Sequence, residues 1–356
     1  MSRATRAEIQ LQNLQHNLQL ARSTSNSKLM AVIKANAYGH GIVDVALALR
    51  ETDAFGVATL DEGITLREGG VYKPIVLLEG IQRADDLLYV HAYDLQVVVH
   101  HQFQIDLIGQ STRPVRVWLK MDTGMHRLGF TPQDFNQAYE QLVAMPNVVQ
   151  PIQLMTHLAC ADDREAATTT RQIEAFDDVC QAYSNNEKSI ANSAGILGWP
   201  QTHRDWVRPG IMLYGVSPFT KGNGQELGLK PVMTLYSELI AINALKKGDA
   251  IGYGSTYVCE KDMPVGVVAI GYGDGYPRHA GTGTPVLING KLVPLIGRVS
   301  MDMITVDLSD CPETKIGDEV VLWGQGLPVE VIAEHADTIG YELLCGVTRR
   351  VVMQYI

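Results

Sequence analysis

The sequence has few cysteines and no long apolar run, and both features limit the kind of protein it can be. Its five cysteines are scattered through 356 residues and are never spaced C-x-x-C, so they predict free thiols in a reducing compartment rather than a disulfide framework or a zinc site. No stretch approaches the ~18 apolar residues of a membrane span, and the polar start MSRATRAEIQ lacks the apolar centre of a signal peptide. We therefore expect a cytoplasmic protein without a metal or a membrane partner.

Basic residues are scarce as well. Lys and Arg number 29 against 39 Asp and Glu, which gives a formal net charge of -10, and no basic run is longer than a pair. Because nucleic-acid binding requires clustered positive charge, we expect no nucleic-acid partner. A small positive pocket for an anionic ligand remains compatible with this balance.

The first two thirds of the chain alternate short β-branched runs with longer amphipathic segments such as IVDVALALRE and QIEAFDDVCQAY. Eight runs in βα alternation favour an α/β fold built as a (β/α)8 TIM-type barrel, although a doubly wound open sheet gives a similar pattern. We assign the barrel to residues 1–225. The eight runs are LMAVIKA, AFGVAT, PIVLLEG, LQVVVH, VRVWLKMD, IQLMTHLA, SIANSA and WVRPGIMLYG.

After about Pro218 the pattern changes. The segment FTKGNGQELGLKP is rich in Gly and polar residues and predicts a linker. We assign residues 226–356 to a mainly β C-terminal domain with one short helix at 328–336, and the first few residues of the chain are candidates to pair with it. Its predicted strands lie at short intervals in MTLYSELIAINAL, VGVVAIGYG, TPVLING, KLVPLIG, MITVDL and DEVVLWG.

Lys34 is the first candidate for chemistry. It ends an apolar run at the expected C-terminal mouth of the first barrel strand, where barrel enzymes place their active sites. Packing against Val32 and Ile33 would remove water from its amine and favour the neutral form, which attacks aldehydes. A lysine that extends from a strand end into solvent is the alternative, and Lys34 alone does not decide between the two.

The string around this lysine, AVIKANAYGHG, resembles the pyridoxal-phosphate attachment motif of the alanine racemase family. The resemblance continues in the family's order through LKMDTGMHRLGF, MTHLACAD, NSAG, WVRPGIMLYG, IGYGSTY, GYGDGYPR, GRVSMDM and TIGYELLC. It implies a fold type III enzyme that holds pyridoxal phosphate on Lys34 and interconverts L-alanine and D-alanine.

The resemblance assigns the acid/base groups and the partner of the cofactor ring. Lys34 would form the aldimine and then act as a base on one face of the α-carbon. Tyr253 would act on the other face, because racemisation returns the proton to the opposite side. Arg208 would donate to the pyridine nitrogen without protonating it, which favours racemisation over transamination, and His157 would hold Arg208 in place.

The resemblance also assigns a phosphate site. Barrels commonly bind phosphate after their seventh and eighth strands, which is where Ser193 and the backbone of Gly210 and Ile211 lie. Tyr38 and Tyr341 would add hydroxyl contacts.

Substrate contacts are implied in the same way. Arg127 would contact the substrate carboxylate and the phenolic oxygen of the cofactor, and Lys120, which is carbamylated in many relatives, would support Arg127. The backbone of Met301 would bind the carboxylate from the β domain, with Asp302 beside it in the site lining. The residues that would form the substrate entrance are Tyr272, Arg278 and Asp162.

A homodimer with composite active sites follows from the resemblance. The barrel of one subunit would face Tyr253, Tyr272, Met301 and Asp302 on the β domain of its partner, in a head-to-tail arrangement. We expect activity to fall when the dimer is diluted until it dissociates.

Other functions are compatible with parts of the sequence. A fold type III decarboxylase shares both domains but typically places an acid at the pyridine nitrogen, where this chain has Arg208. A pyridoxal-phosphate carrier would have no use for residues 226–356, and a Schiff-base aldolase on a bare barrel would lack the phosphate residues. A broader serine/alanine racemase differs only in the side chain that it admits. The sequence leaves open whether D-alanine is made for peptidoglycan or broken down for growth.

Overall fold

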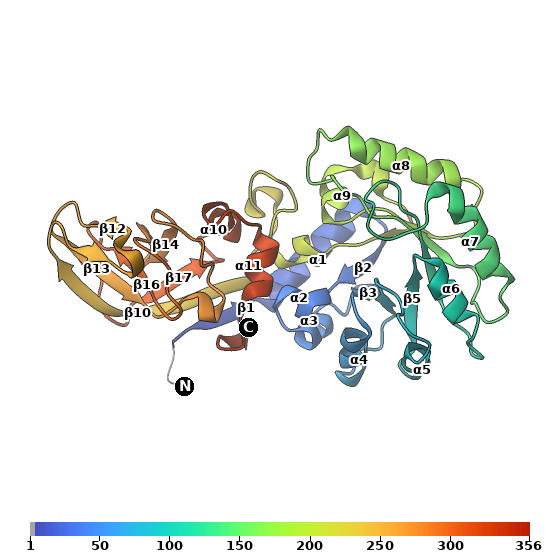
Figure 1. Cartoon of the computed structure of the whole chain (residues 1–356), viewed down its shortest axis with the longest axis horizontal. Helices are drawn as coiled ribbons and strands as arrows, with labels where there is room; N and C mark the ends of the chain where they lie inside the picture. Colours follow the sequence, from blue (N-terminus) through green and yellow to red (C-terminus); the bar gives the residue numbers. More distant parts are fainter. Residues whose placement is uncertain (1–3) are drawn as a thin grey trace.

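The structure, a computed structural model that describes residues 4–356, contains a closed barrel of eight parallel strands (Figure 1). These are β2 (Lys28–Val32), β3 (Ala54–Val57), β4 (Ile75–Leu77), β5 (Leu95–Val99), β6 (Val117–Lys120), β7 (Gln153–Met155), β8 (Lys188–Ser189) and β9 (Trp206–Val207). They lie in chain order, and β2 also pairs with β9, which closes the sheet. The predicted (β/α)8 barrel is confirmed, and the open-sheet alternative is wrong.

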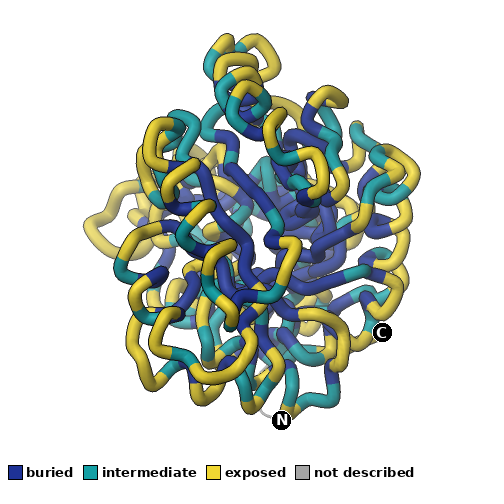
Figure 2. The backbone as a smooth tube through the Cα atoms, turned by 90° about the vertical axis from the view of Figure 1, so that its right-hand side faces the viewer, coloured by how far each residue is buried: buried dark blue, intermediate teal, exposed yellow. Residues whose placement is uncertain are grey.

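Helices surround the barrel, so that the buried strands lie at the centre and partly exposed segments lie around them (Figure 2). The α-helices are α1 (Leu11–Ser25), α2 (Lys34–Tyr38), α3 (Ile42–Ala48), α4 (Leu60–Glu68), α5 (Asp86–Ala92), α6 (Gln102–Ile108), α7 (Pro132–Ala144), α8 (Ala167–Cys180) and α9 (Ser193–Gly198). The 3-10 helices of this part are η1 (Pro200–Thr202), η2 (Ile211–Tyr214) and η3 (Gln225–Leu227). Within residues 4–356, no helix has both the length and the apolar character needed to cross a membrane.

Side chains fill the inside of the barrel. Met30, Trp118 and Trp206 belong to a small buried cluster, whereas Leu29 and Ala31, on either side of Met30, belong to the larger core. Both faces of the parallel strands are therefore apolar, which explains the nearly continuous apolar runs in the sequence. A filled interior leaves the C-terminal mouth of the barrel as the place for a site.

A second sheet confirms the predicted mainly β domain, and its central strand is the 13-residue β10 (Met233–Leu245). The other strands of this sheet are β1 (Arg6–Ile9), β13 (Met263–Val268), β14 (Pro285–Ile288), β15 (Lys291–Pro294), β16 (Ile304–Asp307), β17 (Glu319–Trp323) and β18 (Val352–Tyr355). β1 pairs antiparallel with β10 and parallel with β18, so this sheet contains strands from both ends of the described chain. Residues 1–3 lie outside the described residues. A separate pair of strands, β11 (Ala250–Ile251) and β12 (Tyr257–Val258), and the 3-10 helices η4 (Tyr253–Ser255) and η5 (Tyr272–Asp274) complete the domain.

The expectation of a single helix in this part of the chain is wrong. The predicted helix is present as α10 (Val329–His335), but a second helix, α11 (Gly340–Gly346), follows it. α11 has only seven residues with a glycine at each end, so its intrinsic helix signal is weak. The segment predicted as a linker is packed against α10, because Glu330 Oε1 accepts the N–H groups of Ser217 at 2.8 Å and Gly224 at 2.9 Å.

Candidate active site

A cavity of about 1230 Å³ lies at the C-terminal mouth of the barrel. Its walls come from β2, β6 and β7, from the segments that follow β2, β3, β4, β6, β7, β8 and β9, and from α10 and α11 of the β domain. Both domains therefore shape this one site. The predicted site residues that line it are Lys34, Tyr38, Lys120, Arg127, His157, Asp162, Ser193, Arg208, Gly210, Ile211 and Tyr341.

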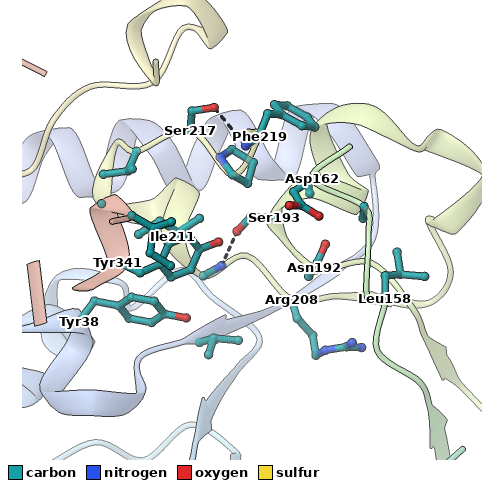
Figure 3. Close-up of a pocket in the computed structure, with 18 of the residues that line it drawn as sticks. Tyr38, Leu158, Asp162, Asn192, Ser193, Arg208, Ile211, Ser217, Phe219 and Tyr341 are labelled. Atoms are coloured by element: carbon teal, nitrogen blue, oxygen red, sulfur yellow. Dashed lines mark hydrogen bonds between the residues drawn. The ribbon is translucent and has the colours of Figure 1, made fainter. Parts of the chain in front are cut away.

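Lys34 begins a turn that winds in the left-handed sense. Residues 35–38 all have φ between 51° and 54°, and none of them is glycine. This conformation costs an L-residue roughly 1–2 kcal/mol, so the surroundings must hold it. One such contact is the Ala35 N–H, which donates to Glu62 Oε1 at 2.6 Å. The turn leaves Lys34 half-buried in the cavity wall and directs Tyr38 into the cavity (Figure 3).

Neutral donors gather where α9 meets η2. The Ser193 hydroxyl oxygen accepts the N–H of Gly210 at 2.9 Å (Figure 3). It also accepts the N–H of Met212 at 3.3 Å. The N–H of Ile211 opens η2, and the first N–H groups of a helix have no partner within it. A Cβ at Gly210 would lie only 2.9 Å from the Tyr38 hydroxyl oxygen, so glycine allows Tyr38 to approach this turn. Hydroxyl and N–H groups at the start of a helix suit a phosphate.

Arg208, which follows β9, is buried beneath the cavity. Its guanidinium donates to Ser189 Oγ at 2.6 Å, to the carbonyl oxygens of Thr156 at 2.6 Å and Ile190 at 3.1 Å, and to His157 Nδ1 at 3.2 Å. Burial lowers the pKa of Arg208 to about 10, so the group still carries its charge at neutral pH. Burial and the charge of Arg208 lower the pKa of His157 well below its ordinary value, and a neutral His157 can accept through Nδ1.

The cavity is lined by charges of both signs, and its carboxylates are those of Glu79, Asp162, Glu330 and Glu334. Lys34, Lys120, Arg127 and Arg208 line it, and within residues 4–356 none of the four forms an ion pair with a carboxylate. Burial, followed by the charges of Arg208 and Arg127, lowers the pKa of Lys120 to about 8. No group of three His, Cys, Asp or Glu side chains in the described chain is arranged to hold a metal ion. The four cations favour an anionic ligand.

Apart from Tyr341, the predicted site residues of the β domain do not reach this cavity within the same chain. Tyr253 is 69% exposed, Met301 is 52% exposed and Tyr272 is 41% exposed. Tyr272 and Met301 lie together, because the Tyr272 N–H donates to Ser300 O at 3.1 Å and the Gly273 N–H donates to Met301 O at 2.9 Å. We call this surface the Tyr272–Met301 face. The predicted residues that do not line the cavity are Tyr253, Tyr272, Arg278, Met301 and Asp302.

Comparison with known families covers both domains. The family model "Alanine racemase, N-terminal domain" matches residues 9–218, and "Alanine racemase, C-terminal domain" matches residues 232–355. The chain belongs to the alanine racemase family.

Similar members of the alanine racemase family extend along the whole chain. The alanine racemase of Shewanella piezotolerans is 51% identical over 98% of each chain, and that of Aliivibrio salmonicida is 49% identical over 99% of each. Among solved structures, the biosynthetic alanine racemase of Pseudomonas aeruginosa has a TM-score of 0.96 at 42% identity and covers 99% of each chain. The alanine racemase of Acinetobacter baumannii has a TM-score of 0.94 at 39% identity and covers 99% of this chain and 100% of the other.

Several side chains that shape the cavity of this alanine racemase family member were not predicted from the sequence. Asn192 caps α9, since its Oδ1 accepts the Gly195 N–H at 2.9 Å, and it lines the cavity beside Ser193. The preference of Asn for helix N-caps could have predicted its position at the start of α9. Phe219 and Cys345 also line the cavity, but they come from a predicted linker and an unpredicted helix, and no local pattern marks them.

Proposed function

We propose that this chain interconverts L-alanine and D-alanine with pyridoxal phosphate attached to Lys34. The cofactor would act as an electron sink for the negative charge at the α-carbon when a proton is removed. Support for its binding comes from the four cations of the cavity and from the donors at Ser193, Gly210, Ile211 and Tyr38, which suit its phosphate. Tyr341, whose ring centre lies 6.0 Å from that of Tyr38, would contribute a further hydroxyl.

The observation that carries this proposal is the setting of Arg208. A guanidinium that donates to four oxygen and nitrogen atoms and keeps its charge can donate to a pyridine nitrogen but does not release a proton to it. The negative charge is then less widely delocalised, which favours return of the proton to the α-carbon over transamination. A decarboxylase of the same fold type would have an acid in this position.

Two bases are required on opposite faces of the α-carbon, and we assign them to Lys34 and to Tyr253 of a partner subunit. The exposure of Tyr253, Tyr272 and Met301 on the β domain fits a head-to-tail homodimer in which the Tyr272–Met301 face meets the cavity of the partner. In that dimer the Met301 backbone would bind the substrate carboxylate, with Asp302 beside it.

Lys120 is proposed to support Arg127 after carbamylation. Carbon dioxide reacts with a neutral amine, and the lowered pKa of Lys120, about 8, leaves part of the amine neutral near physiological pH. The carbamate would add a negative charge among the cations and could accept from Arg127. A ¹³C-bicarbonate NMR experiment should give a carbamate resonance in wild type and none in Lys120→Ala.

Small substrates are favoured by the side chains around the reacting atoms. Tyr341, Arg127 and the partner's Tyr253 would leave room for little more than a methyl group, so we propose alanine as substrate and serine as a slower one. Asp162, with Tyr272 and Arg278 of the partner subunit, would form the entrance. All five cysteines are free, which supports a cytoplasmic location, and both peptidoglycan supply and D-alanine breakdown use this chemistry.

The test is to record the absorbance of the purified protein before and after borohydride, then to assay racemisation by wild type and Lys34→Ala. We expect a band near ~420 nm that borohydride removes, and no L-to-D conversion by the variant. A colourless protein would favour the aldolase. A coloured protein that leaves the configuration of alanine unchanged would favour the decarboxylase or the carrier.

A further inference from the structure

The left-handed turn after Lys34 ends at a buried histidine that has no part in the function proposed above. His40 is fully buried and does not line the cavity. Its Nδ1 lies 3.1 Å from the carbonyl oxygen of Ala37 and 2.9 Å from that of Tyr38. These are the last two carbonyls of the left-handed turn, so His40 contacts the turn at the end opposite to Lys34.

The contacts of His40 determine its tautomer. Both partners of Nδ1 are carbonyl oxygens, which only accept hydrogen bonds, so Nδ1 must carry the proton. Nε2 is buried and has no hydrogen-bond partner among the described residues, as expected for the unprotonated nitrogen. Burial lowers the pKa of His40 to about 4. The side chain is thus a neutral ring that directs one N–H at two backbone carbonyls.

The ring of His40 also supports Tyr38 indirectly, through Tyr214. It packs on Tyr214 with ring centres 4.6 Å apart, and Tyr214 packs on Tyr38 with centres 4.8 Å apart. Tyr214 is held in turn by its hydroxyl, which donates to Val32 O at 3.3 Å. His40 therefore fixes Tyr38 twice, through the backbone of the turn and through the stack of rings.

We propose that His40 is a positioning residue for the cofactor: its Nδ1–H holds the left-handed turn in the conformation that directs both Lys34 and Tyr38 into the cavity. The inference rests on the proposed function for the part played by Lys34 and Tyr38. Without this donor, the buried Tyr38 carbonyl loses its partner, whereas Ala37 O keeps the backbone N–H of His40 at 3.1 Å. L-residues rarely adopt the left-handed conformation, so we expect the turn to relax toward the right-handed region. Lys34 and Tyr38 then no longer point at one ligand together.

A matched pair of variants separates the donor from the packing. In His40→Asn the amide nitrogen takes nearly the place of Nδ1, whereas in His40→Gln it lies nearer the place of Nε2, away from the two carbonyls. We expect His40→Gln to weaken pyridoxal phosphate binding to the apoprotein about tenfold, the cost of one unsatisfied buried acceptor. His40→Asn should remain close to wild type, and both variants should show the same thermal midpoint within a few degrees.

A second measurement and a control variant test whether the effect is specific to His40. Peptide mass spectrometry after borohydride gives the fraction of pyridoxal phosphate trapped on Lys34, which should fall in His40→Gln and recover in His40→Asn. His91→Asn, which removes a histidine contact to Ser111 Oγ on the outside of the barrel, is the control and should change neither quantity. Equal losses of pyridoxal phosphate binding in the Asn and Gln variants would show that His40 contributes only packing, and would overturn the proposal.

Hydrogen exchange distinguishes failure of this proposal from failure of the proposed function. In the apoprotein, the amides of residues 34–41 should exchange faster in His40→Gln than in wild type or His40→Asn, whatever ligand the cavity binds. If wild type binds no pyridoxal phosphate but this exchange pattern holds, the proposed function is wrong and the control of the turn by His40 stands. Unchanged exchange in His40→Gln would overturn the proposal itself.

Discussion

Lys120 shows how a single buried charge can be destabilising and useful in the same site. Its pKa is about 8 against an ordinary value of 10.5, so between these two pH values the unfolded chain binds a proton that the folded chain has released. Stability therefore rises with pH across this window, and the full penalty of the buried charge is present below pH 8. The anionic cofactor and a carbamate would both relieve the penalty.

Lys120→Met should make the apoprotein more stable at neutral pH. The substitution keeps an unbranched side chain of similar length and removes the charge, and we expect a gain on the order of 1–3 kcal/mol at pH 7 that shrinks as pH rises toward 10.5. Thermal unfolding of both apoproteins from pH 6 to 10, in carbon dioxide-free buffer, measures it. Racemisation by the variant should be slower. A gain that does not depend on pH would show that the lysine charge is not the cause.

The left-handed turn at residues 35–38 makes a prediction about side-chain shape. Ala35 is exposed and has φ of 53°, so its substitution tests the backbone with little change in packing. A β-branched side chain is a severe outlier at positive φ, whereas Asn adopts this region readily. We expect Ala35→Val to lower the free energy of unfolding by about 1–3 kcal/mol and Ala35→Asn to change it much less. Urea unfolding of the two variants checks this, and equal losses would argue against a left-handed turn in solution.

The segment after α11 fixes the Tyr272–Met301 face. Arg350 donates from Nη2 to Asp302 Oδ1 at 2.6 Å, and its Nε lies 3.3 Å from Oδ1 of the fully buried Asp274. Asp274 belongs to η5 with Tyr272, and Asp302 follows Met301. One guanidinium therefore joins the two loops that would bind substrate in the partner's cavity.

Arg350→Lys should disturb substrate binding more than cofactor binding. A single ammonium cannot reach both carboxylates in the geometry of the guanidinium fork, so the two loops lose their fixed spacing. We expect KM for alanine to rise about tenfold with a smaller change in kcat, since a backbone contact to the carboxylate exists before and during the reaction. Pyridoxal phosphate affinity should stay unchanged. The neighbouring Arg349→Lys serves as control, and a loss of kcat alone would contradict this role.

The sequence predicted these elements unevenly, for physical reasons. The barrel strands were found because parallel strands buried on both faces need continuous apolar runs. The segment of β1 was predicted only as a candidate to pair with the β domain. Its partners β10 and β18 lie more than 200 positions away in the sequence, and local patterns do not indicate such pairings. The string ANAY does not predict a left-handed turn, because Asn is its only residue type that readily adopts positive φ. Geometry brings the barrel residues of the site together in one cavity, whereas the roles of Tyr253 and Met301 follow from family resemblance, because they lie elsewhere in the same chain.

The arrangement of the whole molecule decides whether one chain can hold a complete site. Lys34 lines the cavity of the barrel, and Tyr253 is exposed on the β domain and does not line that cavity. If the two bases come from different subunits, a dimer contains two sites, and each site takes one base from each chain. Dilution until the dimer dissociates should then abolish activity, and a specific activity that stays constant on dilution to monomers would contradict the composite site.

A mixing experiment tests the shared site directly. Lys34→Ala and Tyr253→Phe homodimers should each be nearly inactive, because every site lacks one base. When they are dissociated and reassociated together, each mixed dimer has one site with both substitutions and one site with neither. With random pairing, half of the dimers are mixed and half of their sites are intact, so activity should return to roughly one quarter of wild type. Recovery requires that Lys34 of one subunit works with Tyr253 of the other, because a site contained in a single chain would remain defective in every combination.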